Sequence, residues 1–93
     1  MLEIQIILDR VIKILSENNE ENFSQVFAGL KEELRNHNND ALYALKRLFG
    51  GAGSFNDLVL HKNGQMLRSE NDELDGLRHK LYDLLMDEIA NAK

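Results

Sequence analysis

Residues 69–90 read SENDELDGLRHKLYDLLMDEIA and predict a long amphipathic helix near the carboxyl end of the chain. Their apolar side chains recur at steps of three and four residues, which places them on one helix face. They are Leu74, Leu77, Leu81, Leu84, Leu85 and Ile89. Ser69 or Asn71 is expected to cap this helix, and the acidic residues that follow complement the positive end of the helix dipole. The stretch therefore favours a helical fold in which this face is buried against other helices.

Three more helices are predicted ahead of it, over residues 4–17, 22–36 and 41–49. Each carries an apolar stripe with helical spacing, and polar runs rich in Asn separate the three. The stripes are Ile4, Ile7, Leu8, Val11, Ile14 and Leu15, then Phe23, Val26, Phe27, Leu30 and Leu34, then Leu42, Leu45, Leu48 and Phe49. The chain contains no proline, a residue that costs about 3 kcal/mol inside a helix.

The centre of the chain predicts irregular structure. The run Gly50-Gly51-Ala52-Gly53 is expected to end the third helix, because glycine readily adopts the left-handed conformation found after helices. Ser54 is expected to cap a short helical turn over residues 55–58. Asn63-Gly64 between apolar pairs indicates a small hairpin. The fold class predicted for residues 1–93 is therefore all-α: one domain, a bundle of about four helices, with a glycine-rich loop and a small hairpin between helices three and four.

Composition and charge narrow the classes of function. The 93 residues suit one domain, and the absence of cysteine excludes disulfides and thiol catalysis. Charged residues interrupt the apolar residues 1–15, so we expect neither a signal peptide nor a membrane helix, and a cytosolic location. The net charge is −5, without the Lys and Arg cluster that nucleic-acid binding requires. We therefore expect no nucleic acid and no membrane among the partners.

No pattern of catalytic or metal-binding residues is recognisable. His37, His61 and His79 lack the spacing of a helical zinc motif and are expected to be isolated surface residues. The glycine run lacks the lysine of a phosphate-binding loop, and no nucleophile motif frames Ser54. We therefore expect no catalytic residue, no metal and no cofactor, and a protein that is not an enzyme. A deep pocket holding two perturbed titratable groups would be the mark of an enzyme instead.

Acidic residues gather at the start of the last predicted helix. Such residues ordinarily complement the helix dipole and are solvated, and a catalytic pair would require a buried member with a raised pKa. The same charges could also bind Lys and Arg side chains of a basic partner. The candidate partner-binding carboxylates are Asp57, Glu70, Asp72, Glu73 and Asp75.

The segment Phe55-Asn56-Asp57-Leu58 has two interpretations. In the structural one, Phe55 and Leu58 fill the end of the bundle, while Asn56 and Asp57 bond to the backbone of the glycine loop. In the functional one, this irregular corner is a docking surface for a partner.

Residues 50–60, GGAGSFNDLVL, followed by ENDEL at 70–74 and by Leu77, resemble a family of small bacterial proteins of uncharacterised function. The hallmark of that family is a Gly-Gly-x-Gly-Ser-Phe-Asn-Asp-Leu core ahead of an acidic helix. Such proteins resemble immunity proteins encoded beside antibacterial toxins, including those of contact-dependent growth inhibition. The resemblance implies a protein that binds and neutralises a cognate toxin, a nuclease with a basic active site, by stoichiometric association. It implies no catalytic residue.

A second hypothesis is a helical adaptor or regulatory module that self-associates. Ile6 and Ile12 lie off the stripe of the first helix and would form the seam of a homodimer. The residues alone leave the oligomeric state open.

Overall fold

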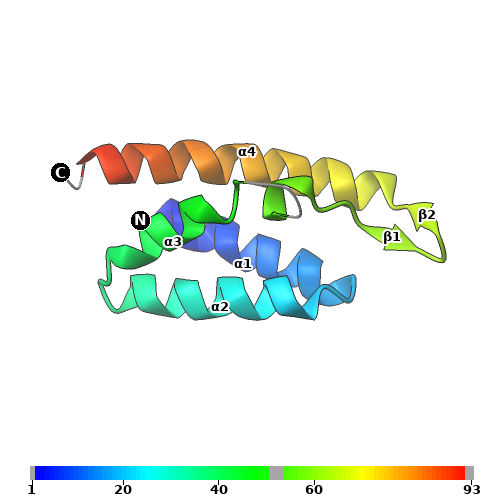
Figure 1. Cartoon of the computed structure of the whole chain (residues 1–93), viewed down its shortest axis with the longest axis horizontal. Coiled ribbons are helices and arrows are strands. Elements are labelled where there is room, and N and C mark those ends of the chain that lie inside the picture. The colour runs from blue at the N-terminus through cyan, green and yellow to red at the C-terminus, as the bar shows by residue number, and fades with distance from the viewer. Residues whose placement is uncertain (1, 51–53, 92–93) are drawn as a thin grey trace.

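The computed structural model describes residues 2–50 and 54–91 as a mainly helical domain (Figure 1). The elements are α1 (Leu2–Glu17), α2 (Glu21–Arg35), α3 (Asp40–Arg47), the 3₁₀ helix η1 (Phe55–Asp57), the strands β1 (His61–Lys62) and β2 (Gln65–Met66), and α4 (Arg68–Asn91). The predicted helical bundle, with a small hairpin between helices three and four, is therefore confirmed. The predicted helix-closing role of residues 51–53 lies outside the described residues.

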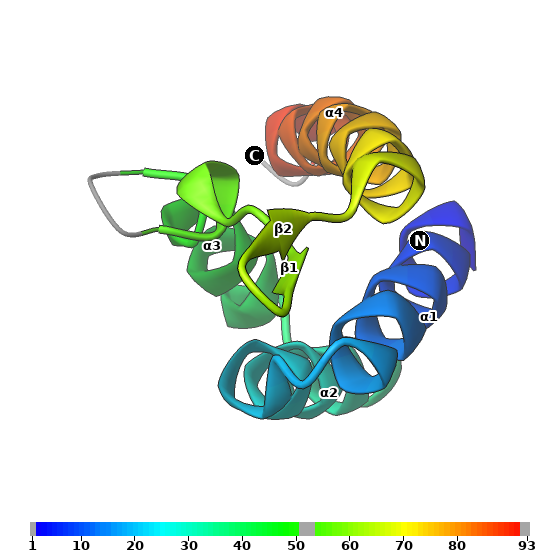
Figure 2. The same ribbon diagram turned by 90° about the vertical axis from the view of Figure 1, so that its right-hand side faces the viewer.

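The four helices run back and forth along the long axis of the molecule, which measures 44 × 22 × 19 Å (Figure 1). Helix α1 packs against α2 and α4, and α3 packs against the same two helices. Figure 2, which looks along the bundle, shows the helices around a shared interior with the hairpin near one end. Because α3 has 8 residues and α4 has 24, α3 covers only part of α4. The segment from η1 through the hairpin runs alongside the first half of α4 (Figure 1).

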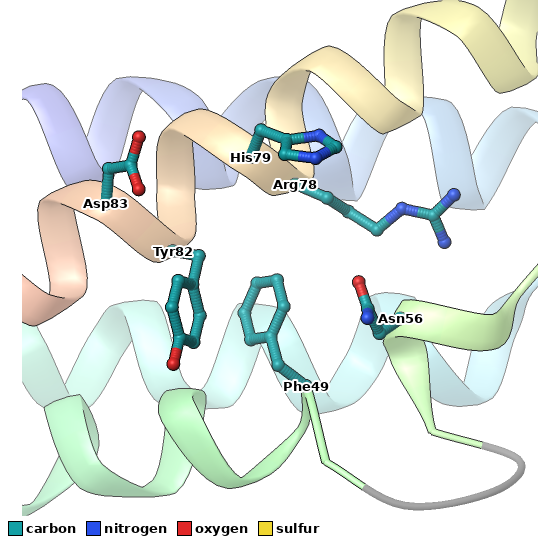
Figure 3. Close-up of a pocket in the computed structure, with 6 residues that line it drawn as sticks. All are labelled: Phe49, Asn56, Arg78, His79, Tyr82 and Asp83. Atoms are coloured by element: carbon teal, nitrogen blue, oxygen red, sulfur yellow. The ribbon is translucent and has the colours of Figure 1, made fainter.

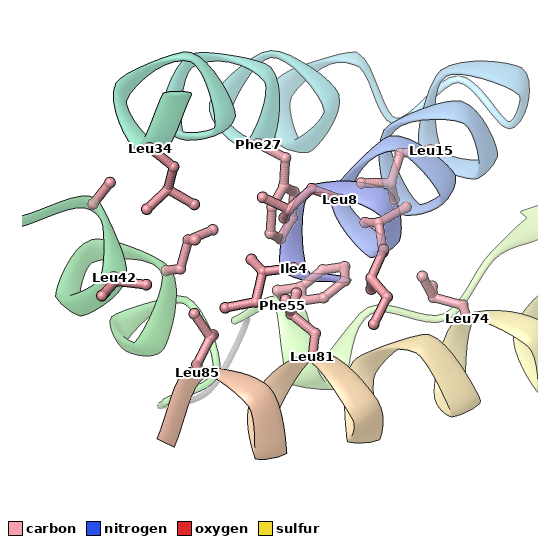
Figure 4. Packing of buried hydrophobic residues seen from close by; sticks show 14 of the residues in the cluster. Ile4, Leu8, Leu15, Phe27, Leu34, Leu42, Phe55, Leu74, Leu81 and Leu85 are labelled. Atoms are coloured by element: carbon pink, nitrogen blue, oxygen red, sulfur yellow. The ribbon is translucent and has the colours of Figure 1, made fainter. Parts of the chain in front are cut away.

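The core joins the predicted stripes of all four helices (Figure 4). All six residues of the α1 stripe are buried, and Leu74, Leu81 and Leu85 of α4 are fully buried. The prediction that Val26 belongs to the core is wrong, since 44% of it is exposed. The buried face of α2 instead centres on Phe27 and extends to Ser24, 7% exposed. Successive helix residues are turned by about 100°, so Val26 lies to the side of that face.

The predicted cap of α4 is a second correction. The helix begins at Arg68, so Ser69 and Asn71 lie within its first turn rather than before it. The Asn71 side chain points into the protein and bonds to backbone groups there. Its Oδ1 accepts from the Leu60 amide at 2.7 Å, and its Nδ2 donates to the Leu60 and Leu67 carbonyls at 3.0 and 2.8 Å. Asn71 therefore ties the chain before β1 to α4, because Leu60 needs partners for both backbone groups in a buried position.

The hairpin and the short helical turn form where the sequence predicted them. Asn63 and Gly64 both have positive φ, 55° and 78°, as the two-residue turn requires. The strands pair antiparallel, with His61 opposite Met66. Ser54 occupies the cap position of η1, but its hydroxyl makes no capping hydrogen bond, so the predicted side-chain cap is absent. Within the described ranges, none of the helices combines the length and apolar character needed to cross a bilayer.

Candidate functional site

Phe55 is the centre of the irregular segment. Its side chain is fully buried and its ring centroid lies 4.6 Å from that of Phe27, 5.6 Å from Phe49 and 5.9 Å from Phe23. Aromatic pairs at these separations add stability beyond the area they bury. Leu58 packs partly buried against the same core. Phe55 and Leu58 thus pack on the core, as the structural interpretation predicted, but beside the middle of α4 rather than at an end of the bundle (Figure 1). The predicted bonds of Asn56 and Asp57 to the glycine loop involve residues 51–53, outside the described residues.

Arg78 holds this segment against α4. The side chain is 6% exposed, and its Nη1 donates to the carbonyls of Phe55 and Leu58, both at 2.8 Å. Its Nη2 donates to the Asp75 carboxylate, and the guanidinium carbon lies 5.5 Å from the centroid of the Phe55 ring. A buried cation is tolerated when it is paired and its donors are satisfied. Arg78 is paired with Asp75, and three of its hydrogen bonds go to groups of this chain.

Sequence reasoning missed Arg78, although a signal was present. Arg78 follows Leu74 by four residues and precedes Leu81 by three, so helical spacing places it on the buried stripe. Asn71 precedes Arg78 by seven residues and shares the same face. A polar side chain inside an apolar stripe indicates a buried partner. We call Phe55, Asn71 and Arg78 the buried anchors, because they join residues 54–60 to α4.

A groove lies between α4 and the residues that lead from α3 to the hairpin. It consists of two open hollows, of about 310 and 340 Å³, which share Asn56 and Arg78. The first hollow is also lined by Phe49, His79, Tyr82 and Asp83 (Figure 3). The second is also lined by Leu58, Val59, Met66, Arg68, Asn71, Asp72 and Asp75. We call the two together the α4 groove; it is the candidate site.

The five predicted partner-binding carboxylates do not share one face. Asp72 and Asp75 line the α4 groove. Asp57 lines a third hollow, which shares Leu58 and Val59 with the second. Glu73 faces α1, where its carboxylate lies 2.6 Å from the guanidinium of Arg10, and Glu70 lines none of these hollows. The division follows from the helix, because a turn of about 100° per residue separates residues 70 and 73 from 72 and 75.

The charges of the groove are unevenly compensated. Asp75 pairs with the buried Arg78, and the exposed Arg68 lies beside Asp72 in the second hollow. Asp83 makes no ion pair with any residue in the described ranges. Uncompensated negative charge therefore lies at the end of the first hollow. Sequence reasoning missed Asp83, although its spacing of four from His79, itself four from Asp75, places all three along one edge of α4.

Ring faces and hydrogen-bond acceptors are available in the first hollow. The rings of Phe49 and Tyr82 lie 5.4 Å apart in an edge-to-face arrangement, and 39% of Tyr82 is exposed. His79 Nδ1 lies 2.8 Å from the Asp75 carbonyl, which only accepts, so Nδ1 carries the proton and Nε2 remains an acceptor in the neutral ring. Such groups suit recognition of another molecule.

The three histidines lie on separate elements: His37 follows α2, His61 is in β1 and His79 is in α4. In the part of the chain that the structure describes, no three His, Asp or Glu side chains are grouped so that they could hold a metal ion.

Of the two residues expected to form a dimer seam on α1, Ile6 and Ile12, only Ile6 is exposed. Ile6 is 55% exposed, and Leu2, one turn before it, is 72% exposed. Ile12 instead packs partly buried against the core, because α1 is covered on two sides, by α2 and α4. Ile6 and Ile12 therefore do not form one exposed strip, and the exposed apolar pair on α1 is Leu2 and Ile6.

The protein is thus a small helical bundle. The described residues between α3 and the hairpin form one wall of its α4 groove. The chain belongs to a family described as a domain of unknown function, DUF6966, whose model matches residues 16–68. No curated protein and no solved structure matches the chain. The matched range contains α2, α3, η1 and the hairpin, and hence one wall of the α4 groove. The other wall, α4, lies beyond that range except for Arg68.

Proposed function

We propose that this protein is an immunity protein, which binds a cognate antibacterial toxin in the cytoplasm and neutralises it by stoichiometric association. The toxin is expected to be basic, as a nuclease that must hold phosphates is. The observation that carries the proposal is the α4 groove. Asn56, Leu58 and Val59 of the resembling motif line one wall, and the acidic helix that follows the motif supplies the other.

The wall of the groove formed by residues 54–60 is fixed to the helices, which favours tight binding. Arg78 and Asn71 fix residues 54–60 by hydrogen bonds to the backbone, and Phe55 fixes them by aromatic contacts. A surface that is already ordered loses little conformational entropy when a partner binds. The partner-binding surface that we propose is therefore the groove itself rather than a segment that folds on binding.

The charge of the chain favours a basic partner. The net charge is −5, and Asp72 and Asp83 are exposed along the groove. Opposite charge on two partners accelerates their encounter and disfavours other acidic proteins. Of the five carboxylates predicted from the sequence, Asp72 and Asp75 belong to this surface. Asp57 adjoins it across η1, while Glu70 and Glu73 would require a second contact area.

Co-expression with the product of the adjacent gene tests the proposal. We expect that product to be lethal alone and harmless when this protein is present, and the two to purify as a complex of fixed ratio. The double variant Asp72→Asn with Asp83→Asn should weaken the complex. The control is Glu33→Gln, an exposed carboxylate on α2, the helix on the opposite side of the bundle from α4 (Figure 2). A product that is harmless alone, or lethal in the presence of this protein, contradicts the immunity function.

Self-association is the second candidate, favoured by the exposed pair Leu2 and Ile6 on α1. Light scattering over a range of concentrations distinguishes the two functions. A tight homodimer that the substitution Ile6→Lys dissociates, and that has no affinity for the adjacent product, would favour the adaptor.

A further inference from the structure

We infer that the first hollow of the α4 groove receives one arginine side chain of the partner protein. The inference rests on the proposed function, because it assumes that the groove binds a protein, and it adds which side chain of that protein enters. The residues that carry it are Phe49, Asn56, His79, Tyr82 and Asp83, which we call the arginine pocket (Figure 3).

The aromatic residues provide a surface for a planar cation. Tyr82 is held edge-to-face against Phe49, with ring centroids 5.4 Å apart, and 39% of it is exposed. A guanidinium group stacks on such a ring, since it is planar and more weakly hydrated than an ammonium group. Phe49 in turn packs on the buried Phe55, at 5.6 Å, so both rings are supported from the core.

The cation that already lines the hollow does not repel an incoming one strongly. Both Nη atoms of Arg78 bond to groups of this chain: Nη1 to the carbonyls of Phe55 and Leu58, and Nη2 to the Asp75 carboxylate. The Arg78 and Asp75 charges thus offset each other. Asp83 remains without an ion pair to the described residues, and its carboxylate can accept two parallel hydrogen bonds from a guanidinium group.

Acceptors lie along the pocket, with Asp83 at one end and Asn56 at the other (Figure 3). His79 Nδ1 lies 2.8 Å from the Asp75 carbonyl, which leaves Nε2 for a partner. The exposed amide of Asn56 offers a carbonyl oxygen. Arginine carries five N–H donors in a fixed plane and no acceptor, whereas lysine presents a compact charge with less tendency to stack. The hollow of about 310 Å³ lies near the lower limit of about 300 Å³ for ligand pockets, which suits a single side chain.

The test is an NMR titration of the full chain with Nα-acetyl-arginine methylamide, compared with the citrulline analogue, which has nearly the same shape but no charge. We expect saturable shifts at the amides of Asn56, Tyr82 and Asp83. The citrulline analogue should bind about fivefold more weakly, since one charge-dependent contact is lost. The lysine analogue should also bind more weakly than arginine.

Substitutions then separate the contributions of the pocket. Asp83→Asn and Tyr82→Ala should each weaken arginine binding about fivefold, whereas Tyr82→Phe, which retains the ring, should change it little. Glu33→Gln on α2 is the control and should leave binding unchanged. Equal shifts with citrulline, shifts centred elsewhere, or no saturable shift would each overturn the assignment.

The two proposals fail in different experiments. If the adjacent gene product is neutralised equally well by Asp83→Asn and Tyr82→Ala, and the arginine probe does not bind, the pocket is wrong and the immunity function stands. If the probe binds as described but the product is not neutralised, the immunity function is wrong and the pocket remains as a site for another partner.

Discussion

Phe55, Asn71 and Arg78 are buried at the base of the α4 groove, whereas Tyr82, His79 and Asp83 are exposed at its rim. Each buried anchor is held by several groups: Arg78 by two carbonyls and a carboxylate, Asn71 by the backbone of Leu60 and Leu67. Asp83 has no ion pair among residues 2–50 and 54–91. Side chains whose bonding is complete stabilise the fold, and side chains with bonding capacity left over can bind a partner.

The largest effect is expected for Phe55→Ala. Removing a fully buried phenylalanine that contacts three other aromatic rings should lower the free energy of unfolding by about 3–5 kcal/mol. Urea denaturation followed by circular dichroism measures the loss. Phe55→Leu is the milder variant if the alanine variant does not fold. Val26→Ala, at an exposed position, should change stability by less than about 0.5 kcal/mol. Equal losses at Phe55 and Val26 would contradict the assignment of the core.

The next largest effect is expected for Arg78→Met. The substitution keeps much of the apolar stem but removes the donor of the Leu58 carbonyl and leaves the Phe55 carbonyl with the Leu58 amide alone. We expect a loss of about 2–4 kcal/mol in the free energy of unfolding. The same urea experiment measures it. The matched control is Arg35→Met, since Arg35 is an exposed arginine at 3.4 Å from Glu32. Exposed ion pairs contribute about 0–1 kcal/mol, so a comparable loss at both arginines would refute the role of Arg78 as an anchor.

Asn71→Ala should cost less, about 1–3 kcal/mol. The variant leaves the amide of the buried Leu60 without its acceptor, while the Leu60 carbonyl keeps the hydrogen bond from the Leu67 amide. Hydrogen exchange provides the sharper measurement, because the Leu60 amide should lose its protection even where global stability falls only slightly. If that amide stayed protected in the variant, another group would have to satisfy it. Ser69→Ala, at an exposed residue of the same turn, is the control.

The helices could be predicted from the sequence because the periodicity of apolar residues determines them locally. Leu74, Leu81 and Leu85 are buried as their spacing indicates, and Asn63-Gly64 forms the turn that its residue types favour. Of the predicted α2 stripe, Phe23, Phe27, Leu30 and Leu34 pack in or on the core and only Val26 does not, because periodicity alone does not fix which edge of a stripe meets its neighbours.

The groove could not be predicted in the same way, because its two walls are distant in the chain. Phe49 and Asn56 face Tyr82 only once α4 has packed beside η1. The carboxylates predicted from the sequence were chosen for closeness along the chain, which mixes the side of α4 that faces α1 with the side that lines the groove. Asp83 was overlooked because it lies beyond the acidic first turns. Asp83 is related to the acidic first turns of α4 only by steps of four residues, from Asp75 to His79 and from His79 to Asp83.

The smallest effect on stability is expected at the rim. Asp83→Asn and Tyr82→Phe should change the free energy of unfolding by less than about 0.5 kcal/mol, since Asp83 pairs with no described residue and Tyr82→Phe retains the ring contact with Phe49. Thermal and urea unfolding measure this directly. The decisive quantity is the contrast with Arg78→Met. Arg78→Met should lower the free energy of unfolding several-fold more than Asp83→Asn, although both residues line the same hollow. Asp83→Asn should instead act on partner binding. A loss at Asp83 as large as that at Arg78 would mean that the rim also serves the fold, and that its charge is not available to a partner.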